Sequence, residues 1–271
     1  MPDKSASSAP PSLWMPELDR AWLRRHRAHD VVEIARRWKA VARRARMRME
    51  TIHLTAGGPV LFLKSRRMTD RPVYFCAGVH GDEPAAVQGL LVWAEARAEE
   101  LRNADLAIFP LFNPAGILLN TRADEGGHDL NRLFDSATHP HMMAWREAVR
   151  GLSPRYAVCL HEDYDAQGLY CYELNRDPRI RLADGLLERC SPMIPRDARK
   201  VIEGRRAANG VIQRRRIPMI TNLPEAVVLY RAGAGSTLTF ETPSEFDFAL
   251  RTRVHAQFAQ RVWEISKEAE A

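Results

Sequence analysis

Four short apolar runs, each ending in polar residues, are the feature of this sequence that most limits its fold. They read PVYFCAGV (residues 72–79), LAIFPLFN (106–113), YAVCLHED (156–163) and STLTFETPSEF (236–246). Their β-branched and aromatic side chains are typical of strands that are buried on both faces. The four runs therefore predict the central strands of a buried sheet.

Helical patterns alternate with these runs. Residues 84–101 begin with a proline, which suits the first turn of a helix, and residues 16–46 predict one or two Arg-rich helices. A last helix is predicted at residues 244–268, and residues 51–65 predict a hairpin with a Gly-Gly-Pro turn. The alternation predicts the α/β class, as a single three-layer α/β/α domain with a mixed, mostly parallel central sheet.

The chain has 271 residues, of which 45% are hydrophobic and 27% charged, enough for one large domain. We expect a flexible tail at residues 1–13 and one domain at residues 14–271. No stretch approaches 18 apolar residues, and the N-terminus lacks the apolar segment of a secretory signal. The sequence therefore predicts a cytoplasmic protein without a membrane span, and it gives no indication of oligomeric state.

The net charge of +6 is unevenly distributed. Residues 17–50 hold 11 Arg and Lys against 5 Asp and Glu, and residues 176–216 hold 12 against 5, so the remaining chain is acidic. This distribution argues against a uniformly basic nucleic-acid-binding protein. Basic runs of this kind are more often the solvated faces of amphipathic helices.

Polar residues gather where the predicted strands end. His80 and Glu83 follow the first apolar run three residues apart, and His161 lies near the end of another. In open α/β sheets, ligands bind beyond the carboxyl ends of the strands, so these side chains are candidates for one shared site. Two His and one Glu form a known ligand set for catalytic zinc. The alternative is a turn histidine at His80, with Glu83 favoured by the dipole of the following helix.

A Gly-rich segment and a strand end supply further polar candidates. The segment TRADEGGHDLNRLF (121–134) contains Arg122, Asn131 and Arg132. Arginine suits the capture of a carboxylate or the stabilisation of an oxyanion, although a surface arginine is the commoner case. Glu241 ends an apolar strand, where a raised pKa would suit a general base. Its alternative role is that of a helix cap with Ser244.

Five motifs, in this order, resemble those of the zinc carboxypeptidases and their aspartoacylase and succinylglutamate desuccinylase relatives. They read HGDE (80–83), NPAG (113–116), DLNR (129–132), LHED (160–163) and FETPS (240–244). The resemblance implies a zinc carboxypeptidase fold, of the phosphorylase/hydrolase-like kind, for the catalytic domain. It also implies one Zn²⁺ per chain.

The same resemblance implies a role for each residue near the metal. His80, Glu83 and His161 match the zinc ligands of the family. Glu241 resembles the general base, which later passes its proton to the leaving amine. Arg122 is similar to the arginine that polarises the scissile carbonyl and steadies the oxyanion.

Residues further from the metal are implicated in substrate binding. Asn131 and Arg132 resemble the pair that holds the free carboxylate of the substrate. Tyr230 lies in the segment where the digestive enzymes carry a mobile tyrosine, although it is only 11 residues upstream of the predicted base. Tyr170 and Tyr172 are expected in the core of a strand rather than in the pocket.

Three functions are compatible with these motifs. A carboxypeptidase-like hydrolase would cut small peptides with a free carboxylate, whereas a deacylase of the succinylglutamate desuccinylase/aspartoacylase type would act on N-acyl amino acids. Only 30 residues follow Glu241, too few for the β-rich C-terminal domain of the deacylases, which favours the first function. The third is a non-catalytic protein of the same fold that binds an anionic partner, and the intact motif residues argue against it.

Overall fold

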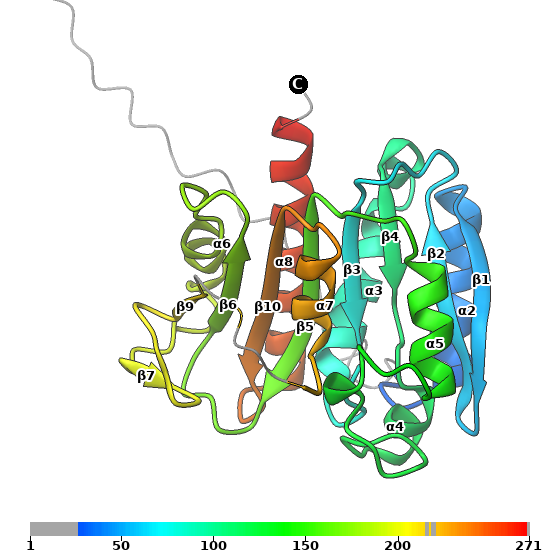
Figure 1. The fold of residues 1–271 in the computed structure, drawn as a ribbon, viewed down its shortest axis with the longest axis horizontal. Coiled ribbons are helices and arrows are strands. Elements are labelled where there is room, and N and C mark those ends of the chain that lie inside the picture. Colours follow the sequence, from blue (N-terminus) through cyan, green and yellow to red (C-terminus); the bar gives the residue numbers. More distant parts are fainter. Residues whose placement is uncertain (1–26, 215–216, 218–220, 270–271) are drawn as a thin grey trace, which may run out of the picture.

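Eight strands pair into one central sheet in the computed structural model, which describes residues 27–214, 217 and 221–269 (Figure 1). In chain order these strands are β1 (Arg48–Thr55), β2 (Gly58–Lys64), β3 (Val73–Ala77), β4 (Leu106–Phe109), β5 (Tyr156–Asp163), β6 (Tyr170–Asn175), β9 (Val211–Arg214) and β10 (Ser236–Pro243). Their order across the sheet is β1-β2-β4-β3-β5-β10-β6-β9. A separate hairpin consists of β7 (Val201–Ile202) and β8 (Arg205–Arg206).

The centre of the sheet is parallel. Strands β4, β3, β5 and β10 run in one direction, and β2 and β6 pair antiparallel at either side of them. These four parallel strands are the four apolar runs of the sequence, and β1 and β2 are the predicted hairpin. The predicted mixed, mostly parallel sheet is thus confirmed, whereas β9 was not predicted.

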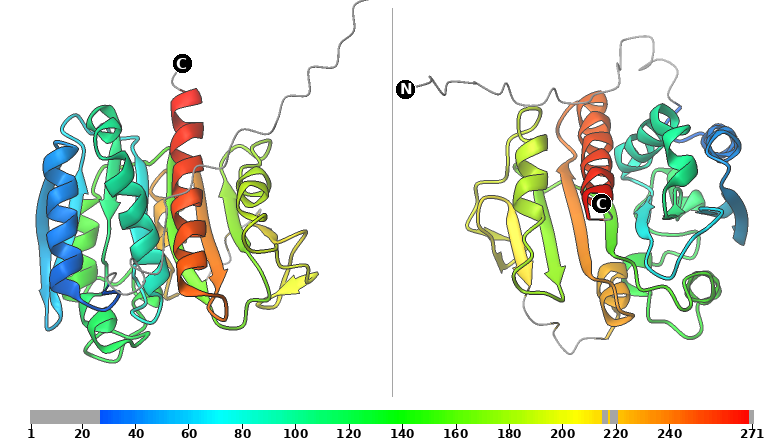
Figure 2. Two further views of the ribbon diagram at one scale, coloured as in Figure 1. Left: turned by 180° about the vertical axis from the view of Figure 1, so that it is seen from behind. Right: turned by 90° about the horizontal axis from the view of Figure 1, so that it is seen from above.

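Helices cover both faces of the sheet and complete the three layers (Figure 2). One face carries α2 (Val31–Arg44), α3 (Pro84–Arg97), α6 (Ala183–Cys190) and α8 (Phe248–Glu268), and the other carries α5 (Pro140–Ala148) and α7 (Glu225–Arg231). Three short elements follow strands or lie in loops, namely η1 (Glu100–Asn103), α4 (Pro114–Leu119) and η2 (Leu130–Arg132). The predicted tail at residues 1–13 and the boundary at residue 14 lie outside the described residues.

Side-chain caps decide where two of the predicted helices begin. Helix α2 follows Asp30, whose carboxylate accepts a hydrogen bond from the backbone N–H of Glu33 at 2.9 Å. Helix α8 begins at Phe248 rather than at residue 244, because the Asp247 carboxylate accepts from the N–H of Leu250 at 3.1 Å. The prediction for this helix was therefore four residues too long at its N-terminal end.

The register of the parallel strands sets the place of the candidate site. Ala77, the last residue of β3, pairs with Leu160 on β5, and Glu241 on β10 pairs directly with His161 on β5. The ends of three adjacent strands therefore bring their polar residues to one edge of the sheet. The described part of the chain contains no helix with the length and apolar character of a bilayer span.

The tight crossing of α3 and α8 generates a test of the fold. A methyl group on Gly89 of α3 would lie 2.3 Å from His255 Cβ and 2.7 Å from the Thr252 carbonyl oxygen. We expect Gly89→Ala to lower the free energy of unfolding by about 1–3 kcal/mol, because overpacking outweighs the gain in helix propensity. Urea denaturation measures the change.

Gly185 on α6 supplies the matched control. It is exposed, and a methyl group added there would meet no heavy atom within 4 Å. We expect Gly185→Ala to raise the free energy of unfolding by about 0.5–1 kcal/mol through helix propensity alone. Equal effects of the two substitutions would contradict the described crossing.

Candidate metal centre

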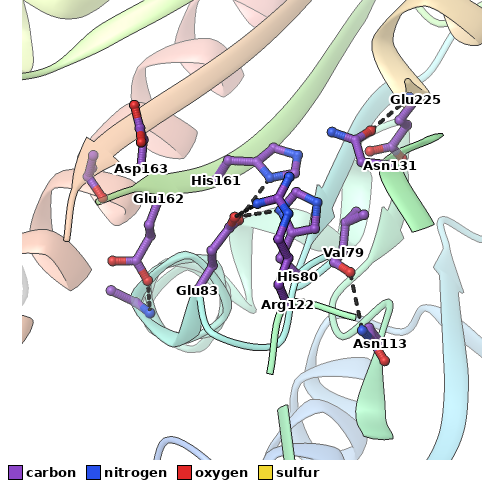
Figure 3. A network of polar contacts seen from close by, with 12 residues as sticks. Val79, His80, Glu83, Asn113, Arg122, Asn131, His161, Glu162, Asp163 and Glu225 are labelled. Carbon is purple, nitrogen blue, oxygen red and sulfur yellow. Dashed lines mark hydrogen bonds and ion pairs between the residues drawn. The ribbon is translucent and has the colours of Figure 1, made fainter. Parts of the chain in front are cut away.

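A buried carboxylate lies between two imidazoles at the predicted metal site (Figure 3). Glu83 Oε1 is 2.5 Å from His80 Nδ1, and Glu83 Oε2 is 2.8 Å from His161 Nδ1. All three side chains are buried, and one donor atom from each lies within 4.8 Å of the other two. The three residues predicted as metal ligands are thus brought together from β3 and β5.

The turn after β3 explains how His80 and Glu83 face the same point. Gly78 adopts a φ of +71°, which reverses the chain at the end of the strand. Gly81 lies against α4 so closely that a Cβ would be 1.8 Å from the carbonyl carbon of Gly116. The two glycines of the HGDE and NPAG motifs therefore contact each other and hold the turn in place.

Glu83 does not act as a helix cap. It precedes α3 as the N-cap residue, yet its side chain makes no capping hydrogen bond to the helix. Its carboxylate contacts the two histidines instead. Its place at the start of α3 is also where the helix dipole favours an acid, so the dipole and the two histidines act on the same carboxylate.

The donor set fits a transition metal of the zinc class. Two imidazole nitrogens and a carboxylate are typical ligands of catalytic zinc, with a further position open to water. Burial lowers the pKa of His80, but Glu83 and Asp129 outweigh this and raise it to about 9. Burial likewise raises the pKa of Glu83, whereas His80 and His161 together hold it far below its usual value. The cluster thus favours a proton or a metal ion between its donor atoms.

Asp129, which was not predicted as a site residue, connects the metal cluster to Arg122. One of its carboxylate oxygens lies 3.1 Å from His80 Nε2, and the other accepts hydrogen bonds from Arg122 Nε and Nη2 at 3.2 and 3.1 Å. Arg122 Nη1 is also 3.7 Å from Glu83 Oε1. A carboxylate behind a ligating histidine orients the ring and raises its basicity. In the sequence, the one indication of a role for Asp129 is that it is the first residue of the DLNR motif.

The other predicted polar residues line one open pocket of about 1110 Å³ together with the metal cluster. Glu241, Arg122, Asn131 and Arg132 are all among its lining residues. The Asn131 side-chain oxygen accepts a hydrogen bond at 3.1 Å from the backbone N–H of Glu225, which ties its loop to α7. The predicted residues therefore add a carboxylate and two guanidinium groups to the metal cluster in one pocket.

Glu241 faces this pocket from the strand that adjoins His161. Its burial raises the pKa of its carboxyl group well above the usual value, the neighbouring His161 opposes this rise, and the Glu83 carboxylate adds to it. A carboxylate with a raised pKa is a better proton acceptor near neutral pH. The position of Glu241 beside a predicted metal ligand is thus suited to proton transfer.

Tyr230 differs from the expectation, whereas Tyr170 is buried in a core cluster as expected and Tyr172 packs against that cluster. Tyr230 is not among the residues that line the pocket, and its ring instead lies 5.0 Å from the Arg176 guanidinium carbon. Tyr170 and Tyr172 lie on β6 and do line the pocket, where their hydroxyls donate to Asp163 at 2.8 Å and Glu203 at 2.6 Å. The structure therefore does not place Tyr230 at the site, and it brings β6 there instead.

Comparison with known proteins agrees with this geometry. Residues 69–150 match the family model of the succinylglutamate desuccinylase/aspartoacylase catalytic domain, whereas no curated protein sequence matches the chain. The match contains HGDE, NPAG and DLNR.

Solved structures share the fold over most of the chain. A protein of Shewanella denitrificans OS217, provisionally named a metallopeptidase, has a TM-score of 0.77 at 21% identity and covers 86% of this chain and 89% of its own. A metallo-carboxypeptidase from Burkholderia cenocepacia has a TM-score of 0.65 at 16% identity, with coverages of 88% and 69%. The predicted family resemblance is confirmed.

The murein-tripeptide amidase MpaA from Escherichia coli O157 shares this zinc carboxypeptidase-like fold more distantly. Its TM-score is 0.54 at 17% identity, and the match covers 79% of this chain and 92% of the amidase. At these identities the solved structures show the fold, which is the predicted α/β/α class.

The cluster predicts which residues control metal content. We expect His161→Ala to lose bound metal, because one of three protein ligands is removed. We expect Asp129→Asn to keep the metal with roughly 10–100-fold weaker affinity, because the residue only orients His80. Elemental analysis and competition with a chelator measure both. Full metal content in His161→Ala would contradict the assignment.

Proposed function

We propose that the protein is a zinc-dependent hydrolase of amide or peptide bonds, carboxypeptidase-like in its substrates. The observation that supports this most directly is the shared pocket, in which His80, Glu83 and His161 converge next to Glu241. The family match and the fold support a hydrolase, and metallocarboxypeptidases are among the proteins with this fold.

The chemistry divides between the metal and the side chains of the chain. When bound to the three ligands, zinc would acidify a water molecule and polarise the scissile carbonyl. Glu241 would accept a proton from the attacking water and then deliver it to the leaving nitrogen. Arg122 would donate hydrogen bonds to the oxygen that becomes negative, and Asp129 would hold its guanidinium group in place.

Arg132 and Asn131 would hold the free carboxylate of the substrate. Arg132 is exposed at the pocket, and its Nη1 donates to the Asn131 carbonyl oxygen at 3.0 Å, which fixes the side chain beside that residue. A guanidinium group binds a carboxylate through two parallel hydrogen bonds. Binding at this point would set the distance between the substrate terminus and the bond that is cut.

The pocket is large enough for either a small peptide or an N-acyl amino acid. Its volume of about 1110 Å³ exceeds the usual range of small-molecule sites, which is roughly 300–1,000 Å³. A deacylase activity is the second candidate, because residues 69–150 match the succinylglutamate desuccinylase/aspartoacylase catalytic domain. Turnover of small peptides against N-acyl amino acids distinguishes the two.

The role of Glu241 predicts a separation of metal binding from turnover. We expect Glu241→Gln to retain one zinc per chain and to lower kcat/KM by about 10²–10⁴-fold, because the amide cannot accept the proton. Elemental analysis and steady-state kinetics on the best peptide substrate measure the two quantities. Unchanged kcat/KM in this variant would reject Glu241 as the base.

The role of Arg132 predicts a dependence on the substrate carboxylate. We expect Arg132→Met to raise KM roughly 10–100-fold for a free-acid peptide, because a charge-assisted hydrogen bond is lost. The C-terminal amide of that peptide should be a poor substrate for both proteins. Arg150→Met is the control, since Arg150 is exposed and pairs with Glu147 outside the pocket. Equal KM values for wild type and Arg132→Met would contradict carboxylate binding there.

A further inference from the structure

A second cluster of metal-binding residue types lies outside the pocket, in the segment between α4 and α5. It contains Asp124, His128 and His139, and one donor atom from each lies within 4.8 Å of the others. Asp124 Oδ1 is 3.2 Å from His128 Nδ1, and Asp124 Oδ2 is 3.2 Å from His139 Nε2. One carboxylate thus faces two imidazoles, as in the first cluster.

The geometry of the second cluster parallels that of the first. The His128 and His139 ring centroids are 5.4 Å apart, compared with 5.0 Å for His80 and His161. Two ligands held about 2.05 Å from one ion at a tetrahedral angle lie roughly 3.3 Å apart. Asp124 Oδ2 alone lies 3.4 Å from His128 Nδ1 and 3.2 Å from His139 Nε2, close to that separation.

The charge of Asp124 is compensated by backbone N–H groups and imidazoles rather than by a lysine or an arginine. Only 7% of its side chain is exposed, and its Oδ1 accepts backbone N–H bonds from Gly126 and His128 at 2.9 and 2.8 Å. Within the described residues, neither a lysine nor an arginine forms an ion pair with it, and its charged-group contacts are the two histidines. A mostly buried carboxylate is stabilised by a paired cation or a bound metal ion.

We propose that Asp124, His128 and His139 form a second binding site for a divalent transition-metal ion of the zinc class. The two imidazole nitrogens and one carboxylate oxygen are the ligands, and water completes the coordination. The proposal is independent of the hydrolase activity, because none of the three residues lines the pocket.

The second metal ion would stabilise the loop that carries the arginines of the pocket. His139 directly precedes α5, whereas Asp124 and His128 lie before Asp129, so one ion would join the two ends of the intervening segment. The regular structure of that segment is the single turn η2, which leaves its conformation dependent on side-chain contacts. A bound metal favours the folded state by mass action.

Metal stoichiometry tests the proposal. The untagged full chain is stripped with a chelator and brought to equilibrium by dialysis against micromolar free Zn²⁺, and bound zinc is then measured. We expect two zinc ions per wild-type chain, and one in each of His128→Gln, His139→Gln and His161→Ala. The double variant His128→Gln/His161→Ala should bind none.

His53→Gln is the matched control. His53 stacks on His141 at 5.2 Å, near the cluster, but contributes none of the three donor atoms. This variant should retain two zinc ions. One zinc per wild-type chain, or two in both His128→Gln and His139→Gln, would overturn the proposal.

Thermal unfolding of His161→Ala gives an independent readout. Zinc at 100-fold excess over its dissociation constant should raise the Tm of this variant by roughly 5 °C. The increase should disappear when His128→Gln is added, because one of the proposed ligands is removed. His128 is exposed, so the substitution leaves the fold intact. An equal increase in both variants would place the binding site elsewhere and refute the assignment.

Discussion

The burial of the Glu83 carboxylate is the constraint on which the arrangement of the site depends. A charge removed from water needs compensation of several kcal/mol, and this carboxylate obtains it from two imidazoles, one in the turn after β3 and one on β5. His80 in turn contacts Asp129, and Asp129 holds Arg122. Acidic and basic side chains therefore alternate from the buried Glu83 through His80 and Asp129 to the exposed Arg122. A change of charge at one member affects the protonation and orientation of the others.

This charge network can exist because the central strands are parallel and in register. Parallel strands end at the same edge of the sheet, so the side chains of residues that are far apart in the chain come into contact there. His161 and Glu241 are direct partners on β5 and β10, although 80 positions separate them in the sequence. The contact of Gly81 with Gly116 adds a steric requirement, since any larger residue would push the turn that carries His80 away from the sheet.

The loop between α4 and α5 has an unusual role in this architecture. It supplies Arg122, Asn131 and Arg132 to the pocket and Asp129 to the contact with His80. Its position depends on the buried side chains of Leu130 and Phe134 and on polar contacts, such as the bond between Asn131 and the N–H of Glu225. The proposed second metal cluster lies in the same loop. Two carboxylate–histidine clusters would then serve different purposes on one fold: one for chemistry, the other for the order of the residues that bind substrate.

The sequence by itself determined the four central strands, α3 and the side chains that converge at their ends, because continuous apolar runs and residue type are local properties of the chain. It did not predict Asp129 as a site residue, because the role of Asp129 depends on a contact with His80, which is 49 positions away in the chain. It also placed Tyr230 at the pocket, and it favoured the core for the β6 tyrosines, where Tyr170 is buried although both tyrosines also line the pocket. Only the tertiary structure decided these points, because the antiparallel pairing of β6 with β10 turns Tyr170 and Tyr172 toward the site, and α7 directs Tyr230 to Arg176. Which strand lies beside another is a long-range property that no local pattern records.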